Sequence, residues 1–176
     1  MGLVGYGTFV TEEQTETEEE EPAESLGDPM STLTLNAASS NYFKLTAAGE
    51  SILMNDNESA ARLGELYRSS MTGASSGDGT STAMFVGGHI TFSSDTPFTG
   101  GVTEIEITSS SCPLDIEFRG ISVGDSLATV KEKLSTSTTT INQNLTDECV
   151  ITVSSDYGTV TLTVEYGVLT KIVISG

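Results

Sequence analysis

The sequence predicts an α+β fold, a tandem repeat of a unit in which one amphipathic helix packs on an antiparallel sheet of three to four strands. Three observations lead to this prediction. Two segments show helical spacing of apolar residues. Each is followed by segments that alternate apolar and polar residues, as half-buried strands do. The same order of segments occurs twice in 176 residues, and a helix of this kind buries its apolar face by lying across the sheet.

Residues 1–29 are predicted to be a disordered acidic tether. The segment 12–28 carries nine of the 25 acidic residues and no basic residue, and such a charge run is usually solvated and without fixed structure. The ten uncharged residues at the start are too few to span a bilayer, which takes about 20 residues. Three interpretations of them stay open: a cloning remnant, a disordered start, or the outer end of a membrane anchor trimmed from a longer protein.

The first unit is predicted to span residues 30–109. Alternation of apolar and polar residues in 31–47 predicts one or two strands. Residues 57–70 then show helical spacing, with Asn57 or Ser59 as the N-cap. Four side chains form the apolar face of this helix: Ala60, Leu63, Leu66 and Tyr67.

A loop, a hairpin and a strand are expected to complete the first unit. Residues 72–82 are rich in Gly and Ser, which predicts a loop. Residues 83–94 predict a hairpin that turns at a Gly-Gly pair. The strand at 102–108 should direct its two isoleucines inward and its two glutamates outward.

The second unit is predicted to span residues 110–176 and to follow the same course. A strand at 113–120 precedes a helix at 124–134 that is capped by Asp125 or Ser126. The apolar face of this helix is formed by Leu127, Val130 and Leu134. Three strands follow, and in the middle one the residues expected to face the core alternate with Thr and Glu: Val160, Leu162, Val164 and Tyr166.

One offset of 67 residues relates the two units. It separates Thr103 from Thr170 and Ser59 from Ser126. At this offset the helix cap, the apolar helix positions, a turn glycine and the isoleucines of the last strand all coincide, which indicates a duplicated unit. Each unit alone is short for a stable core, so we expect the two to share one sheet or to pack face to face.

The segment "GISVGDSLATVKEKL", with the strands that follow it, resembles a known family. Its hydrophobic–x–hydrophobic–Gly–Asp–Ser opening onto a short amphipathic helix is similar to the β-lactamase-inhibitor-protein-like superfamily, which includes the SmpA/OmlA lipoproteins. It is also similar to uncharacterised surface lipoproteins of Gram-positive bacteria. The resemblance covers Leu114 to Gly176 best and reaches the first unit through the repeat. It implies an exported binding domain.

The charge of the chain limits the partners to be expected. The formal net charge is −18 at pH 7, and the part outside residues 12–28 still carries 16 acidic against seven basic residues, a net of −9. Such a surface repels phosphate groups, so no nucleic acid is expected, and a membrane only through an N-terminal anchor absent from this chain. Abundant Ser and Thr with few Lys are typical of exported bacterial proteins, so we expect an extracytoplasmic location, at the cell surface or secreted.

The two cysteines admit two interpretations. Cys112 and Cys149 each stand at the start of a segment that is predicted to be a strand. A disulfide between them would close a loop of about 36 residues and contribute about 3–4 kcal/mol in the chain-entropy model. The alternative is two buried, reduced thiols. A zinc site is not expected, because no pair of closely spaced Cys or His residues is present.

No motif in the sequence assembles a catalytic set. Gly73–Gly77 matches the nucleophile-elbow pattern around Ser75, but a predicted helix precedes it and the chain is short for that fold. His89 is expected to be a surface turn residue of the hairpin. Residues 56–58 offer oxygen atoms to calcium, yet the EF-hand spacing fails and we interpret them as part of a helix cap. No catalytic residue, cofactor or metal is therefore predicted.

The predicted function is a non-enzymatic extracytoplasmic module that binds an unidentified protein or a cell-wall component through a sheet face or the 72–82 loop. Lys171 and Val173 are the candidate binding face, because they replace Glu104 and Glu106 of the first unit and make the outward surface less acidic and partly apolar. Two alternatives stay open: an inhibitor of a secreted enzyme, and a small metal-dependent enzyme built on carboxylates and His89.

Overall fold

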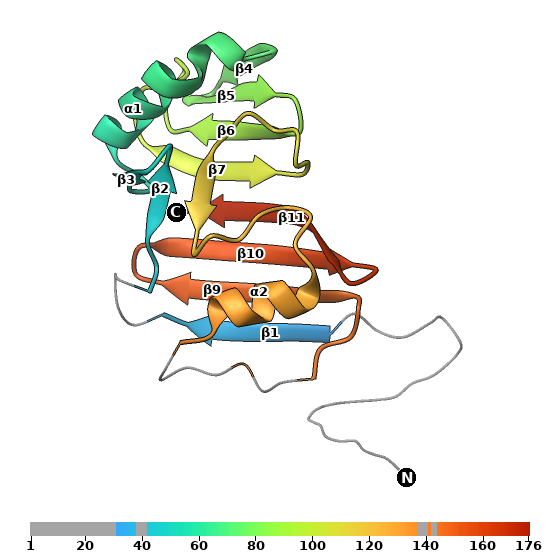
Figure 1. The fold of residues 1–176 in the computed structure, drawn as a ribbon. Coiled ribbons are helices and arrows are strands. Elements are labelled where there is room, and N and C mark those ends of the chain that lie inside the picture. The colour runs from blue at the N-terminus through green and yellow to red at the C-terminus, as the bar shows by residue number, and fades with distance from the viewer. Residues whose placement is uncertain (1–30, 38–41, 137–140, 142–143) are drawn as a thin grey trace. The chain divides into compact units, whose positions relative to one another are not determined.

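The computed structural model describes residues 31–37, 42–136, 141 and 144–176, and within them it confirms the α+β class. These residues form two α-helices, a mostly antiparallel sheet of eight strands and a separate sheet of three strands (Figure 1). The predicted tether at 1–29 lies outside the described residues. Neither of the two described helices combines the length and the apolar character that crossing a bilayer requires.

The large sheet is continuous from one edge to the other. Its strands are, in spatial order, β1 (Ser31–Asn36), β9 (Cys149–Ser155), β10 (Gly158–Glu165), β11 (Val168–Ser175), β7 (Val102–Ile107), β6 (Gly88–Phe92), β5 (Thr80–Phe85) and β4 (Gly73–Gly77). All neighbours are antiparallel except β1 and β9, which run parallel. The small sheet has the order β3 (Glu50–Ile52), β2 (Leu45–Ala47) and β8 (Ile116–Phe118).

The two similar segments at 103–109 and 170–176 lie side by side in the middle of the large sheet. They belong to β7 and β11, which pair antiparallel, with Ile105 opposite Ile174 and Ile107 opposite Ile172. All four isoleucine side chains are buried. Of the two arrangements left open by the sequence, strands from both halves of the chain therefore share one sheet.

Both helices begin at a side-chain cap. Helix α1 (Asn57–Tyr67) is capped by Asp56, which accepts a hydrogen bond from the backbone N–H of Ser59, and is continued by the 3₁₀-helix η1 (Arg68–Ser70). The prediction of Asn57 or Ser59 as cap was therefore wrong, because the backbone is still extended at Asp56 and already helical at Asn57. Helix α2 (Leu127–Leu134) is capped by Ser126, one of the two predicted residues.

The core lies on one face of the large sheet. Helix α1 contacts β7 and helix α2 contacts β11, and Figure 1 shows α2 drawn in front of β9, between β10 and β1. Ala60, Leu63 and Tyr67 of α1 and Val130 and Leu134 of α2 are buried, as their spacing predicts. These side chains belong to the same buried cluster as the inward residues of every strand from β9 to β5, so a single apolar layer joins the helices to the sheet.

Two predicted elements differ in the structure. The segment at 72–82 is not a loop, because β4 pairs with β5 through a two-residue turn at Asp78 and Gly79. Both turn residues have positive φ, 58° and 80°, which is the type I′ turn that suits the twist of a hairpin. Tyr166 does not face the core: it lies with Gly167 in the β10–β11 turn, has φ of 54° and is 89% exposed.

Gly88 offers a test of the packing between β6 and β7. A Cβ atom at Gly88 would lie 2.6 Å from the carbonyl oxygen of Glu106 and 2.8 Å from the Sγ atom of Cys112. We expect Gly88→Ala to lower the free energy of unfolding by about 1–3 kcal/mol, as overpacking does. Urea denaturation measures this loss. Gly73→Ala is the matched control, because a Cβ atom there meets nothing within 4 Å. Equal urea midpoints for the two variants would contradict this close approach of β6 and β7.

Candidate functional site

The face of the large sheet opposite the helices forms an extended surface that we name the open face. The name covers the outward side chains of β1, β9, β10, β11, β7 and β6, away from the β10–β11 turn. They are Thr32, Thr34, Asn36, Val150, Thr152, Ser154, Thr159, Thr161, Thr163, Lys171, Val173, Ser175, Glu104, Glu106, His89 and Thr91. None of these side chains is buried. In the part of the chain that the structure describes, no helix packs on this surface.

Strand register arranges the open face in rows. One row runs through Thr34, Thr152, Thr161, Val173, Glu106 and His89, each opposite the next. Neighbouring positions in such a row are about 4.8 Å apart, and successive outward residues of one strand are about 6.6 Å apart. The result is a regular array of hydroxyl and methyl groups, because six of the sixteen side chains are threonines on β1, β9 and β10.

Lys171 and Val173 lie near the middle of the open face. Both are half-buried, with Lys171 opposite Thr163 and Val173 between Thr161 and Glu106. Lys171 therefore lies beside Thr163 of β10, with Glu165 two residues further along that strand. Val173 places an apolar group beside a carboxylate. The structure therefore puts the two candidate residues on one accessible surface.

His89 lies in β6 and not in a turn, so the prediction of a turn residue was wrong. Its main chain pairs with Met84 and Glu106, because the turn of this hairpin falls one residue earlier than the Gly-Gly pair suggests. The His89 Nε2 atom lies 3.2 Å from Oε1 of Glu104, and the imidazole is 23% exposed. A protonated imidazole would form an ion pair with this carboxylate at the rim of the open face.

The serine motif around Ser75 does not form a nucleophile elbow. Ser75 lies in β4, opposite Thr82 of β5. His89 lies on β6, two strand spacings away, which is about 10 Å. General-base activation needs the two side chains within hydrogen-bond distance, about 3 Å. Within the described residues, Ser75 and His89 are therefore separate features of the sheet.

The Asp56 carboxylate is engaged in the fold. Its Oδ2 atom accepts hydrogen bonds from both the backbone N–H and the hydroxyl group of Ser59, each at 2.9 Å. The Ser59 Oγ atom in turn accepts the N–H of Leu53, also at 2.9 Å. The segment that offered oxygen atoms to calcium therefore joins the start of α1 to the end of the β3 segment, as the cap interpretation predicts.

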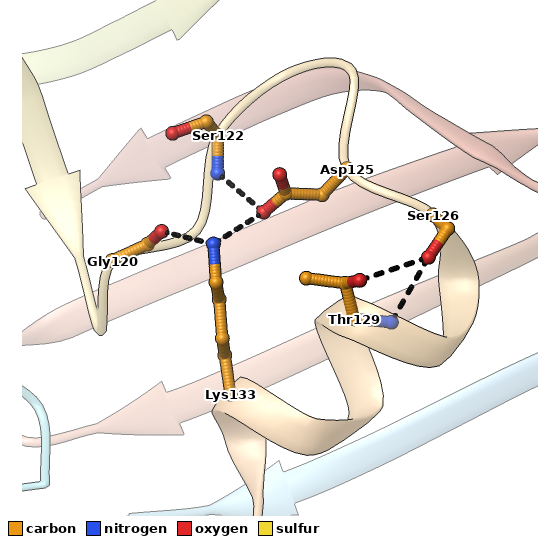
Figure 2. Close-up of polar contacts among 6 residues, drawn as sticks. All are labelled: Gly120, Ser122, Asp125, Ser126, Thr129 and Lys133. Atoms are coloured by element: carbon orange, nitrogen blue, oxygen red, sulfur yellow. Dashed lines mark hydrogen bonds and ion pairs between the residues drawn. The ribbon is translucent and has the colours of Figure 1, made fainter.

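The Gly-Asp-Ser opening of α2 is likewise a structural cap. Figure 2 shows Lys133 reaching back along the helix, where its Nζ atom lies 2.9 Å from Oδ2 of Asp125 and 2.7 Å from the carbonyl oxygen of Gly120. The same Asp125 atom accepts the N–H of Ser122 at 3.0 Å. At the helix start, the Ser126 hydroxyl accepts the N–H of Thr129 at 3.1 Å. These polar groups hydrogen-bond to one another and so stabilise the turn.

Two adjoining hollows lie beside the β9–β10 turn, and sequence reasoning missed them. Their volumes are about 240 and 320 Å³, and both are lined by Leu53, Met54 and Tyr157. Leu53 is 56% and Tyr157 is 47% exposed, so both side chains are accessible to a ligand in the hollows. The lining comes from segments about 100 residues apart, so no local pattern could reveal it. The only local signal was the Asp-Tyr-Gly turn sequence.

Cys112 and Cys149 are both free thiols in the structure, so the disulfide alternative is not realised there. Cys112 packs beside Gly88 of β6, whereas Cys149 opens β9. Four strand spacings separate β6 from β9, about 19 Å, while a disulfide needs Cα atoms within about 7 Å. Burial raises the pKa of each thiol above its usual value of 9.0, which disfavours the reactive thiolate.

Comparison of the chain with protein-family models, with curated proteins and with solved structures found no match. What the site can do chemically therefore follows from its own groups. The open face offers hydroxyl groups, one imidazole–carboxylate pair, one ammonium group and two valines. Such groups can hydrogen-bond to a partner and pack against it.

The Asp56 cap leads to a prediction about stability and calcium. Asp56→Ala should lower the free energy of unfolding by about 1 kcal/mol, because the first turn of α1 loses its acceptor. Glu58→Ala, at an exposed neighbour in the same turn, should change it much less. Urea denaturation with and without millimolar CaCl₂ measures both effects. A midpoint that rises with calcium in the parent protein and not in Asp56→Ala would show a metal site instead.

The free thiols lead to a prediction about pH. Thiol titration in urea should give two thiols per chain without reductant, and Cys149 should react slowly in the folded protein because it is fully buried.

Since folding raises the pKa of both thiols, the folded state holds their protons more tightly than the unfolded state. The free energy of unfolding should therefore be unaffected well below pH 9 and fall as the pH rises above it. Cys149→Ala should show a smaller fall over the same range.

Proposed function

We propose that the protein is a non-enzymatic binding module that acts outside the cytoplasm, at the cell surface or after secretion. Its partner is a protein or a cell-wall component held on the open face. The observation that carries the proposal is that six neighbouring strands present, opposite the helices, a surface on which no helix of the described residues packs. No catalytic residue, cofactor or metal forms part of the proposed activity.

The charge of the open face supports a role in binding. The chain has a formal net charge of −18, yet the open face carries two glutamates against one lysine, with the exposed Glu165 bordering it at the end of β10. A partner that approaches this face therefore meets less repulsion than it would over an evenly acidic surface. Val150 and Val173 add apolar area among the threonines, which favours close packing.

We also propose that residues 30–109 and 110–176 are tandem units. Each half has one α-helix followed by consecutively paired antiparallel strands, four in the first half (β4–β5–β6–β7) and three in the second (β9–β10–β11). The last strands of the two halves, β7 and β11, pair with each other. Ile105 faces Ile174 and Ile107 faces Ile172, and these four isoleucines occupy equivalent positions in the two units at the 67-residue offset. The resemblance of the second half to exported inhibitor-like and lipoprotein domains supports the same arrangement and the extracytoplasmic location.

An inhibitor of a secreted enzyme is the second candidate function. The observation that favours it is a pair of exposed tyrosines at hairpin turns, Tyr157 at 47% and Tyr166 at 89% exposure. Tyrosine is enriched among the residues that dominate binding energy at protein interfaces. The two turns lie at opposite ends of β10, so an inhibitor would insert one of them. Loss of inhibition in Tyr166→Ala or in Tyr157→Ala, but not in both, would identify that turn.

Site-specific photocrosslinking on intact cells tests the open face directly. A photoreactive amino acid at Val173 should yield an adduct with a surface protein or with cell-wall material. The same amino acid at Glu65, which is exposed on α1 on the other side of the sheet, is the matched control and should yield none. Adducts from Glu65 alone, or recovery of the protein only from the cytosol, would contradict the proposal.

A substitution on the open face measures how much Val173 contributes to binding. Val173→Glu places a third carboxylate beside Glu106 and removes the apolar contact, so it should weaken binding of the crosslinked partner by about tenfold or more. Thr34→Ser, near the edge of the same face, should change affinity little. Binding to the partner is measured by surface plasmon resonance, and thermal unfolding checks that both variants remain folded.

A further inference from the structure

Strand β4 leaves one edge of the large sheet open. It is the last strand in the sheet order, and among the described residues it pairs only with β5. All five of its residues are exposed, and its sequence GASSG contains no charged residue, no proline and no bulky side chain. Natural edge strands usually carry such groups, because they prevent pairing with another chain.

The hairpin turn fixes which backbone groups of β4 point outward. The two-residue turn makes Gly77 and Thr80 the hydrogen-bonded pair that closes the hairpin. Hydrogen-bonded and non-hydrogen-bonded pairs alternate along an antiparallel ladder. Gly73, Ser75 and Gly77 therefore direct their N–H and C=O groups toward β5. Ala74 and Ser76 direct theirs away from it, toward the edge.

We propose that β4 pairs antiparallel with β4 of a second copy of this chain, about a two-fold axis at Ser75. In this register Ala74 of each copy lies opposite Ser76 of the other, so the outward N–H and C=O groups of both residues are satisfied. Ser75 of one copy lies opposite Ser75 of the other, and Gly73 of each copy lies opposite Gly77 of the other. The strand is close to palindromic in side-chain size, and small residues at every position let the two backbones approach without a clash.

Charge at this edge permits the pairing. The nearest charged residue on the hairpin is Asp78, and in the proposed register it lies opposite Thr72 of the second copy and not opposite another carboxylate. The other edge strand, β1, is preceded in the sequence by the acidic segment 12–28, which makes it the less suitable edge for self-pairing. Both copies nevertheless carry a net charge of −18, so association should strengthen as salt screens their repulsion.

The proposed dimer is weak. A single pair of five-residue strands buries less surface than the 1,200–2,000 Å² or so of stable complexes. We therefore expect a concentration-dependent equilibrium, in which the mass measured by sedimentation moves from 18.4 kDa toward twice that value as the full chain is concentrated. This inference is independent of the proposed partner of the open face, which lies on the surface of the sheet and not at its edge.

Cysteine crosslinking tests the register. In the proposed pair the Cβ atoms of the two Ser75 residues lie about 4.5–5.5 Å apart, close enough for a disulfide after small adjustment. Ser75→Cys should give a covalent dimer on mild oxidation. Thr80→Cys is the control: it is also exposed, but the two copies would be three strand spacings apart, about 14 Å. The parent protein controls for Cys112 and Cys149.

Two further variants test the edge itself by sedimentation. Ser76→Pro removes an outward N–H group and leaves the bonds between β4 and β5 in place, so it should weaken the dimer by about tenfold or more. Ser75→Lys places two ammonium groups opposite each other and should weaken it in a salt-dependent way. Ser75→Thr is the matched control and should retain the dimer. Unchanged thermal unfolding shows that each variant is folded.

The outcomes separate the proposal from its alternatives. A chain that stays monomeric at high concentration and high salt overturns it. So does a dimer that survives both Ser76→Pro and Ser75→Lys, because such a dimer uses another surface. Equal crosslinking of Ser75→Cys and Thr80→Cys reports random collision and overturns the register. Selective crosslinking of Ser75→Cys with loss of the dimer in the two edge variants supports it.

Discussion

The antiparallel pairing of β7 with β11 holds the large sheet together. Four buried isoleucines face one another across this joint, with β6, β5 and β4 on one side and β10, β9 and β1 on the other. Each side has a single α-helix, too little to enclose a core alone. Because the joint makes the sheet continuous, the apolar layer beneath both helices is shared. The opposite surface is then left as one uninterrupted face.

That constraint explains which features the sequence predicts well. Helix faces and inward strand residues follow from local periodicity, so Leu63, Val130 and Leu162 are buried where their spacing puts them. Pairing partners do not follow from local periodicity, and the sequence left two arrangements of the strands open. The parallel contact of β1 with β9 was not anticipated at all, since nothing in either segment selects a partner or a direction.

The incorrectly predicted elements have local causes. Gly and Ser disfavour an isolated strand, and β4 forms because β5 supplies its hydrogen bonds; the Asp78-Gly79 pair, a strong hairpin signal, was available in the sequence. Asp56 is the cap because the backbone leaves the extended conformation directly after it. The start of a helix is uncertain by one or two residues, so the sequence alone did not identify this residue. Within the candidate site, the outward positions of Lys171 and Val173 follow from strand alternation. The hollows around Tyr157 required the tertiary fold.

The parallel strand β1 has a consequence for how the molecule folds. Ser31 and Thr146, whose hydroxyl groups lie 3.1 Å apart, are separated by 115 positions in the chain. Closing so large a loop carries an entropy cost and slows folding, while the hairpins from β4 to β7 and from β9 to β11 form from near neighbours. We therefore expect β1 to dock late. Until it docks, β9 is itself a free strand edge, and a chain folding at high local concentration is exposed to strand exchange with its neighbours there.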